Sequence, residues 1–406
     1  MSERLEQTLN DVPSGERVHI GFFGIRNAGK SSVVNAVTSQ NLALVSDVKG
    51  TTTDPVKKAM ELLPLGPVVI IDTPGIDDEG TLGEMRVQRT KQMLAQTDIA
   101  VLVADATLGL QPADQELIGI FEERKLPYVI AMNKADLAPG ASEDPHVIYV
   151  SALTGENIEA LKEKMAHLVK DTGKEKTILG DLIGPHETAV LVIPVDQSAP
   201  KGRIILPQQQ VLRELLDRNA IAAVAQASDL RECLASLREP PKLVITDSQA
   251  FKSVMKDTPE TVWTTSFSIL FSRYKGNLAQ QVRGAAALKR LTSEDTVLIS
   301  EGCTHHRQCQ DIGTVKLPGW IEHYTGRTPK WEFTSGGQFP EDLSPYSLVI
   351  HCGGCMLNEK EMHHRLELAK QQNVPMTNYG VAIAEFHGTL RRALGPFPDL
   401  LKLLDE

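Results

Sequence analysis

The chain has 406 residues, of which 41% are hydrophobic and 23% charged, an ordinary globular composition that excludes a wholly disordered protein. At ~150 residues per domain the length predicts two to three domains. The net charge of −10 and the 5% aromatic content argue against a nucleic-acid partner. No apolar run approaches the ~20 residues of a membrane span, and residues 1–17 have no apolar signal core, so we expect a cytoplasmic protein without a membrane partner.

Residues 1–172 alternate short β-branched runs with amphipathic stretches. This alternation predicts an α/β fold with a doubly wound parallel sheet, because parallel strands need crossover helices. The expected strands are Val18–Phe23, Val68–Asp72, Ile99–Asp105, Tyr128–Asn133 and Val147–Ser151. The expected helices are Lys30–Thr38, Thr81–Gln96, Ala113–Arg124 and Asn157–Val169.

A charged, glycine-containing stretch near residues 171–187 indicates a linker, and two smaller α/β domains are predicted beyond it, 173–274 and 275–406. The first of these has no pattern that suggests chemistry, which favours packing or assembly. Its expected elements are strands at 188–193, 220–224 and 242–246 and helices at 208–218 and 228–237. In the last domain we expect strands Thr296–Ser300 and Ser347–Ile350 and helices Met356–Gln372 and Ala382–Leu394.

The segment Gly24–Ser31 matches the P-loop pattern between an expected strand and an expected helix. Backbone amides freed by the glycines can surround phosphates, and the helix N-terminus adds positive potential. Lys30 reaches the β- and γ-phosphates, and the Ser31 hydroxyl ligates Mg²⁺. The nucleotide-binding residues predicted here are Gly24, Asn27, Ala28, Gly29, Lys30, Ser31 and Ser32.

Three further segments end expected strands. Asp72-Thr73-Pro74-Gly75 brings a carboxylate to the Mg²⁺ shell and a glycine amide to the γ-phosphate. Asn133-Lys134-Ala135-Asp136 offers a carboxylate to the guanine edge, a lysine stem to cover the base, and an asparagine to hold the loops together. Ser151-Ala152-Leu153 offers a backbone amide to the guanine O6. In this order the segments predict a GTP-binding domain.

These motifs resemble the translation-factor-related GTPases, especially the tRNA-modification and ribosome-assembly subgroup. By that resemblance Gly50–Asp54 is the first switch, Thr52 closes onto Mg²⁺ and the γ-phosphate, and Asn27 helps bind K⁺. The alternative for Asn27 is a cap of the loop. Ile76 stands where small signalling GTPases carry their water-orienting glutamine, so we expect slow hydrolysis that depends on Lys30, Thr52, Asp72 and Gly75.

Four of the five cysteines lie between residues 303 and 355. Cys303-Thr304-His305 and His351-Cys352-Gly353-Gly354-Cys355 each follow an expected strand, so in one parallel sheet three thiols would meet at one edge. Three interpretations of this pattern remain: a redox dithiol, a zinc site of three cysteines and a histidine, and an iron–sulfur cluster held by three thiolates. Cys309 is expected to be buried or incidental, and Cys233 to be a core residue.

This GTPase pattern, with Cys-x-His, a 45-residue spacer and His-Cys-x-x-Cys, resembles the [FeFe]-hydrogenase maturation GTPases, the HydF family. The resemblance implies a homodimer in which Cys303, Cys352 and Cys355 ligate a [4Fe–4S] cluster, with His305 and His351 as further candidate ligands. It also implies a scaffold that receives a di-iron precursor from radical-SAM maturases and delivers it to apo-[FeFe]-hydrogenase. The alternative is a ribosome- or tRNA-directed GTPase with a zinc module, which the acidic charge disfavours.

Overall fold

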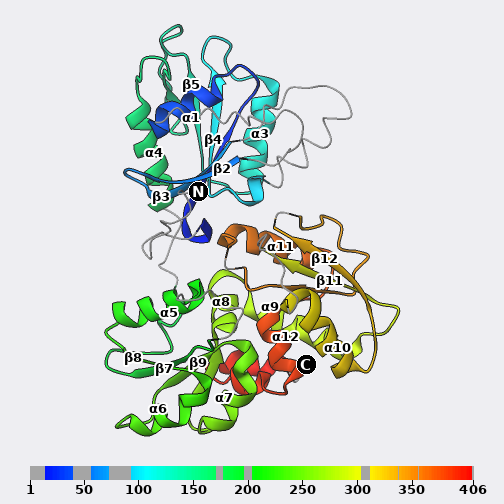
Figure 1. The fold of residues 1–406 in the computed structure, drawn as a ribbon. Helices are drawn as coiled ribbons and strands as arrows, with labels where there is room; N and C mark the ends of the chain where they lie inside the picture. Colours follow the sequence, from blue (N-terminus) through cyan, green and yellow to red (C-terminus); the bar gives the residue numbers. More distant parts are fainter. Residues whose placement is uncertain are drawn as a thin grey trace, which may run out of the picture. The chain divides into compact units, whose positions relative to one another are not determined.

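The computed structural model describes residues 14–39, 56–72, 93–170, 177–195, 204–302, 311–336, 338–354 and 356–404. The chain forms two compact units, Met1–Lys174 and Glu175–Glu406 (Figure 1). Each unit is an α/β structure in which helices cover the faces of largely parallel sheets, as the alternation of strands and helices predicts.

The first unit is built on a six-stranded sheet with the order β2-β3-β1-β4-β5-β6. Helices α1 and α4 pack on one face of the sheet, and α3 packs on the other (Figure 1). The strands are β1 (Val18–Phe23), β2 (Val56–Leu62), β3 (Gly66–Asp72), β4 (Ile99–Asp105), β5 (Tyr128–Asn133) and β6 (Val147–Tyr149). The helices of this unit include α1 (Lys30–Thr38), α3 (Pro112–Glu123) and α4 (Ile158–Lys170).

Strand β2 was not predicted from the sequence, and it pairs with β3 antiparallel while the other pairs are parallel. Its segment, VKKAMEL, carries two lysines and a glutamate, which is why its hydrophobic signal is weak. A short turn joins β2 to β3, so this edge needs no crossover helix. Most of the predicted helix Thr81–Gln96 lies outside the described residues.

The second unit contains two four-stranded parallel sheets, ordered β10-β9-β7-β8 and β12-β11-β13-β14. The first holds β7 (Thr188–Val192), β8 (Ile221–Ala225), β9 (Leu243–Thr246) and β10 (Trp263–Ser266). The second holds β11 (Thr296–Glu301), β12 (Lys330–Ser335), β13 (Leu348–His351) and β14 (Met376–Asn378). Strands β10 and β12 were missed because WTTS and KWEFTS are short and rich in polar residues.

Both sheets of this unit contribute to one hydrophobic core, with Leu191 and Ile245 from the first and Ile299 and Ile350 from the second. Helices α8, α9 and α12 pack against one another in this unit. The division between 173–274 and 275–406 therefore marks a change of sheet within one compact unit, and three separate domains stay a prediction. The helices are α5 (Leu206–Asp217), α6 (Leu230–Ser236), α7 (Phe251–Asp257), α8 (Phe267–Lys275), α9 (Leu278–Ala285), α10 (Leu317–Thr325), α11 (Glu359–Gln371), α12 (Tyr379–Phe386), α13 (Leu390–Ala393) and α14 (Pro398–Leu401).

Two predicted helices differ from those observed. The helix expected from Met356 begins at Glu359, because the Asn358 side chain accepts a hydrogen bond from the Glu361 amide and caps the helix there. The helix expected at Ala382–Leu394 is two helices, α12 and α13, separated at Gly388, whose φ of 67° ends the first of them.

Candidate functional site

The P-loop occupies the turn between β1 and α1, at the carboxyl edge of the sheet. Gly24 has a φ of 151°, and a Cβ there would lie 2.3 Å from Val103 O. Gly29 has a φ of 84°, and a Cβ there would lie 2.2 Å from Asn133 Nδ2. Only glycine fits both positions, because any side chain there would collide with Val103 on β4 or Asn133 on β5. Ser31 and Ser32, at the start of α1, are exposed. The loop therefore has the anion-binding form expected from its sequence.

Asn133, at the end of β5, connects this loop to the last of the predicted guanine segments. Its Nδ2 donates to the Ala28 carbonyl at 3.0 Å, and its Oδ1 accepts from the Ala152 amide at 3.1 Å. Asn133 and Ala28 are 4% and 1% exposed, so the hydrogen bond between them is shielded from water, and the bond from Ala152 is partly shielded. Asn133 thus holds the two loops together, whereas the Ala152 amide, a candidate donor to the guanine O6, already has a protein acceptor.

The neighbouring side chains are also fixed. Asp136 accepts a hydrogen bond from the Ser151 hydroxyl at 2.6 Å, which aligns the carboxylate with the end of β6. Lys134 forms an ion pair with Asp105, the last residue of β4. Burial favours a raised pKa at Asp105, but hydrogen bonds from Lys134 and Thr107 outweigh it and lower the pKa of the carboxyl. Asp105 is a residue that sequence reasoning missed, since it reads only as the end of a strand.

The predicted switch residues are described in part. Thr52 and Gly75 lie outside the described residues. Asp72 ends β3 and is paired in register with Phe22 of β1, so its backbone lies beside the strand that leads into the P-loop. Lys30 is the first residue of α1, and Asn27 is exposed in the loop with a φ of 67°.

The second predicted site lies at the carboxyl edge of the sheet that contains β11 and β13. These strands are parallel neighbours in one sheet, which is the condition stated above, so the segments that follow them leave the sheet at the same edge. The Cys352 amide donates to the Ser300 carbonyl at 2.9 Å. The Cys352 Sγ accepts from the Gly302 amide at 3.0 Å and from the Gly354 amide at 3.4 Å. Backbone amides aimed at sulfur stabilise a thiolate.

The loop after β13 is held by two buried basic side chains. Arg365, on α11, is 2% exposed and donates to the His351 Nε2 at 2.9 Å. Lys275, at the end of α8, is 4% exposed and donates to the Leu357 carbonyl at 3.3 Å. Neither residue was singled out from the sequence, because a charged residue on an amphipathic helix reads as solvent-exposed.

The remaining predicted ligands Cys303, His305 and Cys355 lie outside the described residues, as does Cys309. Among the residues that the structure does describe, no group of three or more His, Cys, Asp or Glu side chains is gathered as a metal site. Cys233 is half-buried on α6 and packs against a small apolar cluster, in agreement with its prediction as a core residue.

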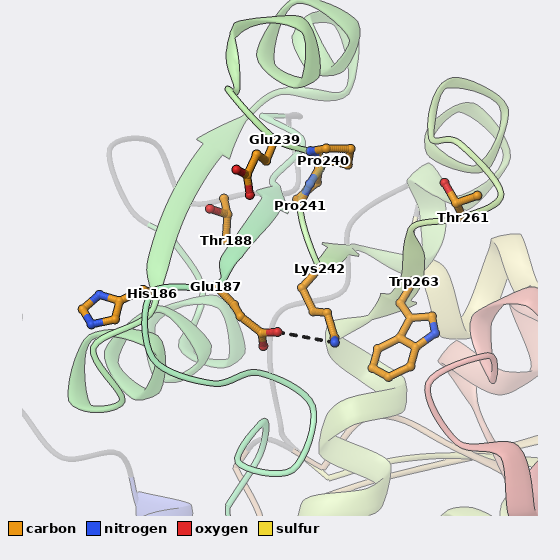
Figure 2. A pocket seen from close by; sticks show the side chains of 9 residues that line it. All are labelled: His186, Glu187, Thr188, Glu239, Pro240, Pro241, Lys242, Thr261 and Trp263. Atoms are coloured by element: carbon orange, nitrogen blue, oxygen red, sulfur yellow. Dashed lines mark ion pairs between the residues drawn. The ribbon is translucent and has the colours of Figure 1, made fainter.

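A cavity of about 400 Å³ in the second unit lies apart from these motifs (Figure 2). His186 and Glu187 precede β7, Lys242 precedes β9, and Trp263 begins β10, so the cavity opens at the amino ends of these strands. Ligands of α/β sheets bind at the carboxyl ends. Lys242 is paired with Glu187 at 3.4 Å and lies 5.0 Å from the Trp263 ring centre, so its charge is satisfied within the wall.

The P-loop, the Asn133–Asp136 segment and the strand order define the first unit as a P-loop GTPase domain, joined to a second α/β unit that carries a cysteine loop. Family models agree. Residues 19–134 match "50S ribosome-binding GTPase", 178–276 match "Hydrogen maturase F dimerization domain", and 279–396 match "Hydrogen maturase F tetramerization domain". The chain belongs to the hydrogen maturase F family of hydrogenase maturation GTPases.

Curated relatives match through the GTPase region. GTPase Der of Nitratidesulfovibrio vulgaris is 31% identical over 211 residues, which cover 46% of this chain and 43% of that protein. The tRNA modification GTPase MnmE of Nitrosomonas europaea is 32% identical over 188 residues, which cover 44% of this chain and 41% of that protein. The chain thus spans less than half the length of these relatives.

Solved structures give similar matches. A probable GTP-binding protein engB is 24% identical, with a TM-score of 0.31 over 38% of this chain and 100% of that one. The G domain of the T. maritima FeoB iron transporter is 26% identical, with a TM-score of 0.30 over 38% of this chain and 99% of that one. Within the part of the chain that the structure describes, no helix is both long and apolar enough to cross a membrane.

Proposed function

We propose that this GTPase is a scaffold that binds a [4Fe–4S] cluster and delivers a di-iron precursor to apo-[FeFe]-hydrogenase, with radical-SAM maturases as further partners. Membership of the hydrogen maturase F family supports the maturation role. The free thiol of Cys233 is compatible with the reducing cytoplasm, where we place its action.

The environment of Cys352 is the observation that carries the cluster assignment. The two amides that donate to its sulfur belong to Gly302 and Gly354, and the next residues in the chain are Cys303 and Cys355. Two separate segments thus place a backbone amide at the same sulfur, and in the sequence each of these glycines is followed by a cysteine. Soft thiolates with N–H donors suit an iron–sulfur cluster, so the donor set fits the group that the family implies.

Cys303, Cys352 and Cys355 would hold the cluster, with His305 as a further candidate. A cluster held by three thiolates supplies one iron with an exchangeable ligand, where an incoming group can bind. The backbone amides of Gly302 and Gly354 would offset the negative charge of the Cys352 sulfur and orient it toward the cluster.

In the GTPase domain, Lys30 would bind the β- and γ-phosphates, Ser31, Thr52 and Asp72 would hold Mg²⁺, and Gly75 would contact the γ-phosphate. We further propose slow, potassium-stimulated turnover in which Asn27 contributes to the K⁺ site. Asn27 is exposed in the P-loop, which supports this role. Nucleotide state would regulate the binding and release of partners rather than the iron chemistry.

The dimerization and tetramerization models support assembly into oligomers, and we propose a homodimer formed through β8. This strand is at the edge of its sheet, and Ile221 and Val224 on it are 52% and 54% exposed. The Ile221 amide donates toward β7, to the Glu187 carbonyl, so the backbone groups of Val224 point to the open side. An open apolar edge is a surface on which a second copy can add its own strand.

The proposal is tested by anaerobic purification, reconstitution with iron and sulfide, and measurement of iron content and EPR. We expect a cluster in the natural protein, loss of it in Cys352→Ala, Cys303→Ala and Cys355→Ala, and normal binding in Cys233→Ala as the matched control. GTP hydrolysis should continue in all four variants. A colourless protein with stoichiometric zinc that binds RNA would favour the ribosome- or tRNA-directed alternative instead.

A further inference from the structure

Arg365 is a buried charge that neither nucleotide binding nor cysteine ligation explains. Its guanidinium donates to the Gly336 carbonyl at 2.8 Å and to His351 Nε2 at 2.9 Å, and it forms an ion pair with Glu361 one helical turn earlier. It also lies 5.0 Å from the centre of the Phe339 ring. A guanidinium withdrawn from water requires such a set of partners, and here the set includes the histidine next to Cys352.

The hydrogen bonds fix the protonation of His351. A guanidinium can only donate, so His351 Nε2 carries the lone pair and accepts. The other ring nitrogen, Nδ1, lies 2.7 Å from the Cys352 carbonyl, which can only accept, so Nδ1 carries the proton. The imidazole is therefore neutral and fully buried, with both nitrogens in use.

We propose that Arg365 is a positioning residue of the cysteine loop. Its guanidinium occupies the Nε2 lone pair of His351, while the Cys352 carbonyl holds the proton on Nδ1, and His351 is thereby withheld from iron. In this arrangement His351 anchors the loop by donating to the Cys352 carbonyl, while the Cys352 sulfur faces the Gly302 and Gly354 amides. His351 then orients a ligand instead of being one. Only the conclusion that His351 does not bind iron rests on the proposed cluster function; its hydrogen bonds do not.

The first test uses cluster-free protein, so it does not depend on the proposed function. In ¹³C-histidine NMR, assigned by His351→Gln, we expect the Nδ1–H tautomer in the natural protein and in Arg365→Lys, which can still donate to Nε2. The double variant Arg365→Met/Glu361→Gln leaves no uncompensated buried charge. It should keep the Nδ1–H tautomer, which the Cys352 carbonyl holds, but shift the ring-carbon signals beside Nε2, because that nitrogen loses its donor. Arg327→Met, at an exposed arginine of the same unit, should change nothing. An Nε2–H form in the natural protein, or unchanged ring-carbon signals beside Nε2 in a folded double variant, would overturn the proposal.

The second test uses reconstituted protein labelled with ¹⁵N-histidine. We expect His351→Gln to bind iron at the same ratio as the natural protein and to leave every histidine nitrogen coupling in pulsed EPR unchanged. This test does not require the double variant to fold. Loss of a coupling in His351→Gln would show that His351 binds iron and would refute the proposal. Failure of the natural protein to bind iron would instead count against the proposed function and leave the tautomer result valid.

Discussion

The side-chain amide of Asn133 donates a hydrogen bond to the main-chain carbonyl of Ala28, 105 residues earlier in the chain, at 3.0 Å. With its second hydrogen bond, from the Ala152 amide, Asn133 joins the phosphate-binding loop to a guanine-binding segment. A single buried side chain therefore fixes the two loops against each other.

Asn133→Ala should weaken binding of GDP and GTP about tenfold or more. The change leaves the buried Ala28 carbonyl and Ala152 amide without their partner, and each such loss costs roughly 1–3 kcal/mol. Titration with a fluorescent guanine nucleotide measures the effect. Gln115→Ala, at an exposed position of α3, is the control and should bind normally. Equal affinities for both variants would contradict the role of Asn133.

Asn27→Gly should abolish the stimulation of GTP turnover by potassium while leaving the rate in sodium unchanged. Glycine is the informative substitution because Asn27 has a φ of 67°, which alanine would adopt only with strain. Steady-state phosphate release in matched K⁺ and Na⁺ buffers measures the effect. If the natural protein turns over equally fast in both salts, Asn27 only caps the loop.

Val224→Lys should convert the oligomer to smaller species. The substitution places a charge on the open edge of β8, where two such edges could no longer pair without bringing like charges together. Light scattering coupled to size exclusion reports the mass. Leu108→Lys replaces an apolar side chain of the GTPase domain that is 64% exposed and should leave the mass unchanged. An unchanged mass for Val224→Lys would remove β8 from the interface.

Asp295→Asn should lower stability at neutral pH but not in strong acid. Hydrogen bonds from Ser347 and Thr292 lower the pKa of Asp295 below 3.8, so the folded state favours the ionised carboxyl. Its contribution is present above the unfolded value of 3.8 and is lost as pH falls through the lower folded value. Urea unfolding at pH 7 and near pH 3 should show a gap between natural and variant protein that narrows in acid. Glu294→Gln is the exposed neighbouring control, and a gap that stays constant would contradict the assignment.

The sequence determined the parts of the protein that depend on local pattern. A P-loop needs its glycines, lysine and serine in one short run, and the buried strands β1, β4 and β5 have the predicted bounds. The sequence also predicted that each cysteine segment follows an apolar strand, whereas the structure established that these strands, β11 and β13, are parallel neighbours.

The tertiary structure was needed to show which polar side chains are buried and which residues they bind. From the sequence, Asp105 is only the last residue of a strand, whereas the structure shows that it pairs with Lys134. Arg365 reads as an exposed helical charge, yet it is 2% exposed and bound to His351. Burial and partner choice arise when distant segments pack, and that information is absent from the spacing of residues along the chain. Thus the sequence located the cysteine loop, and the fold revealed the residue that orients it.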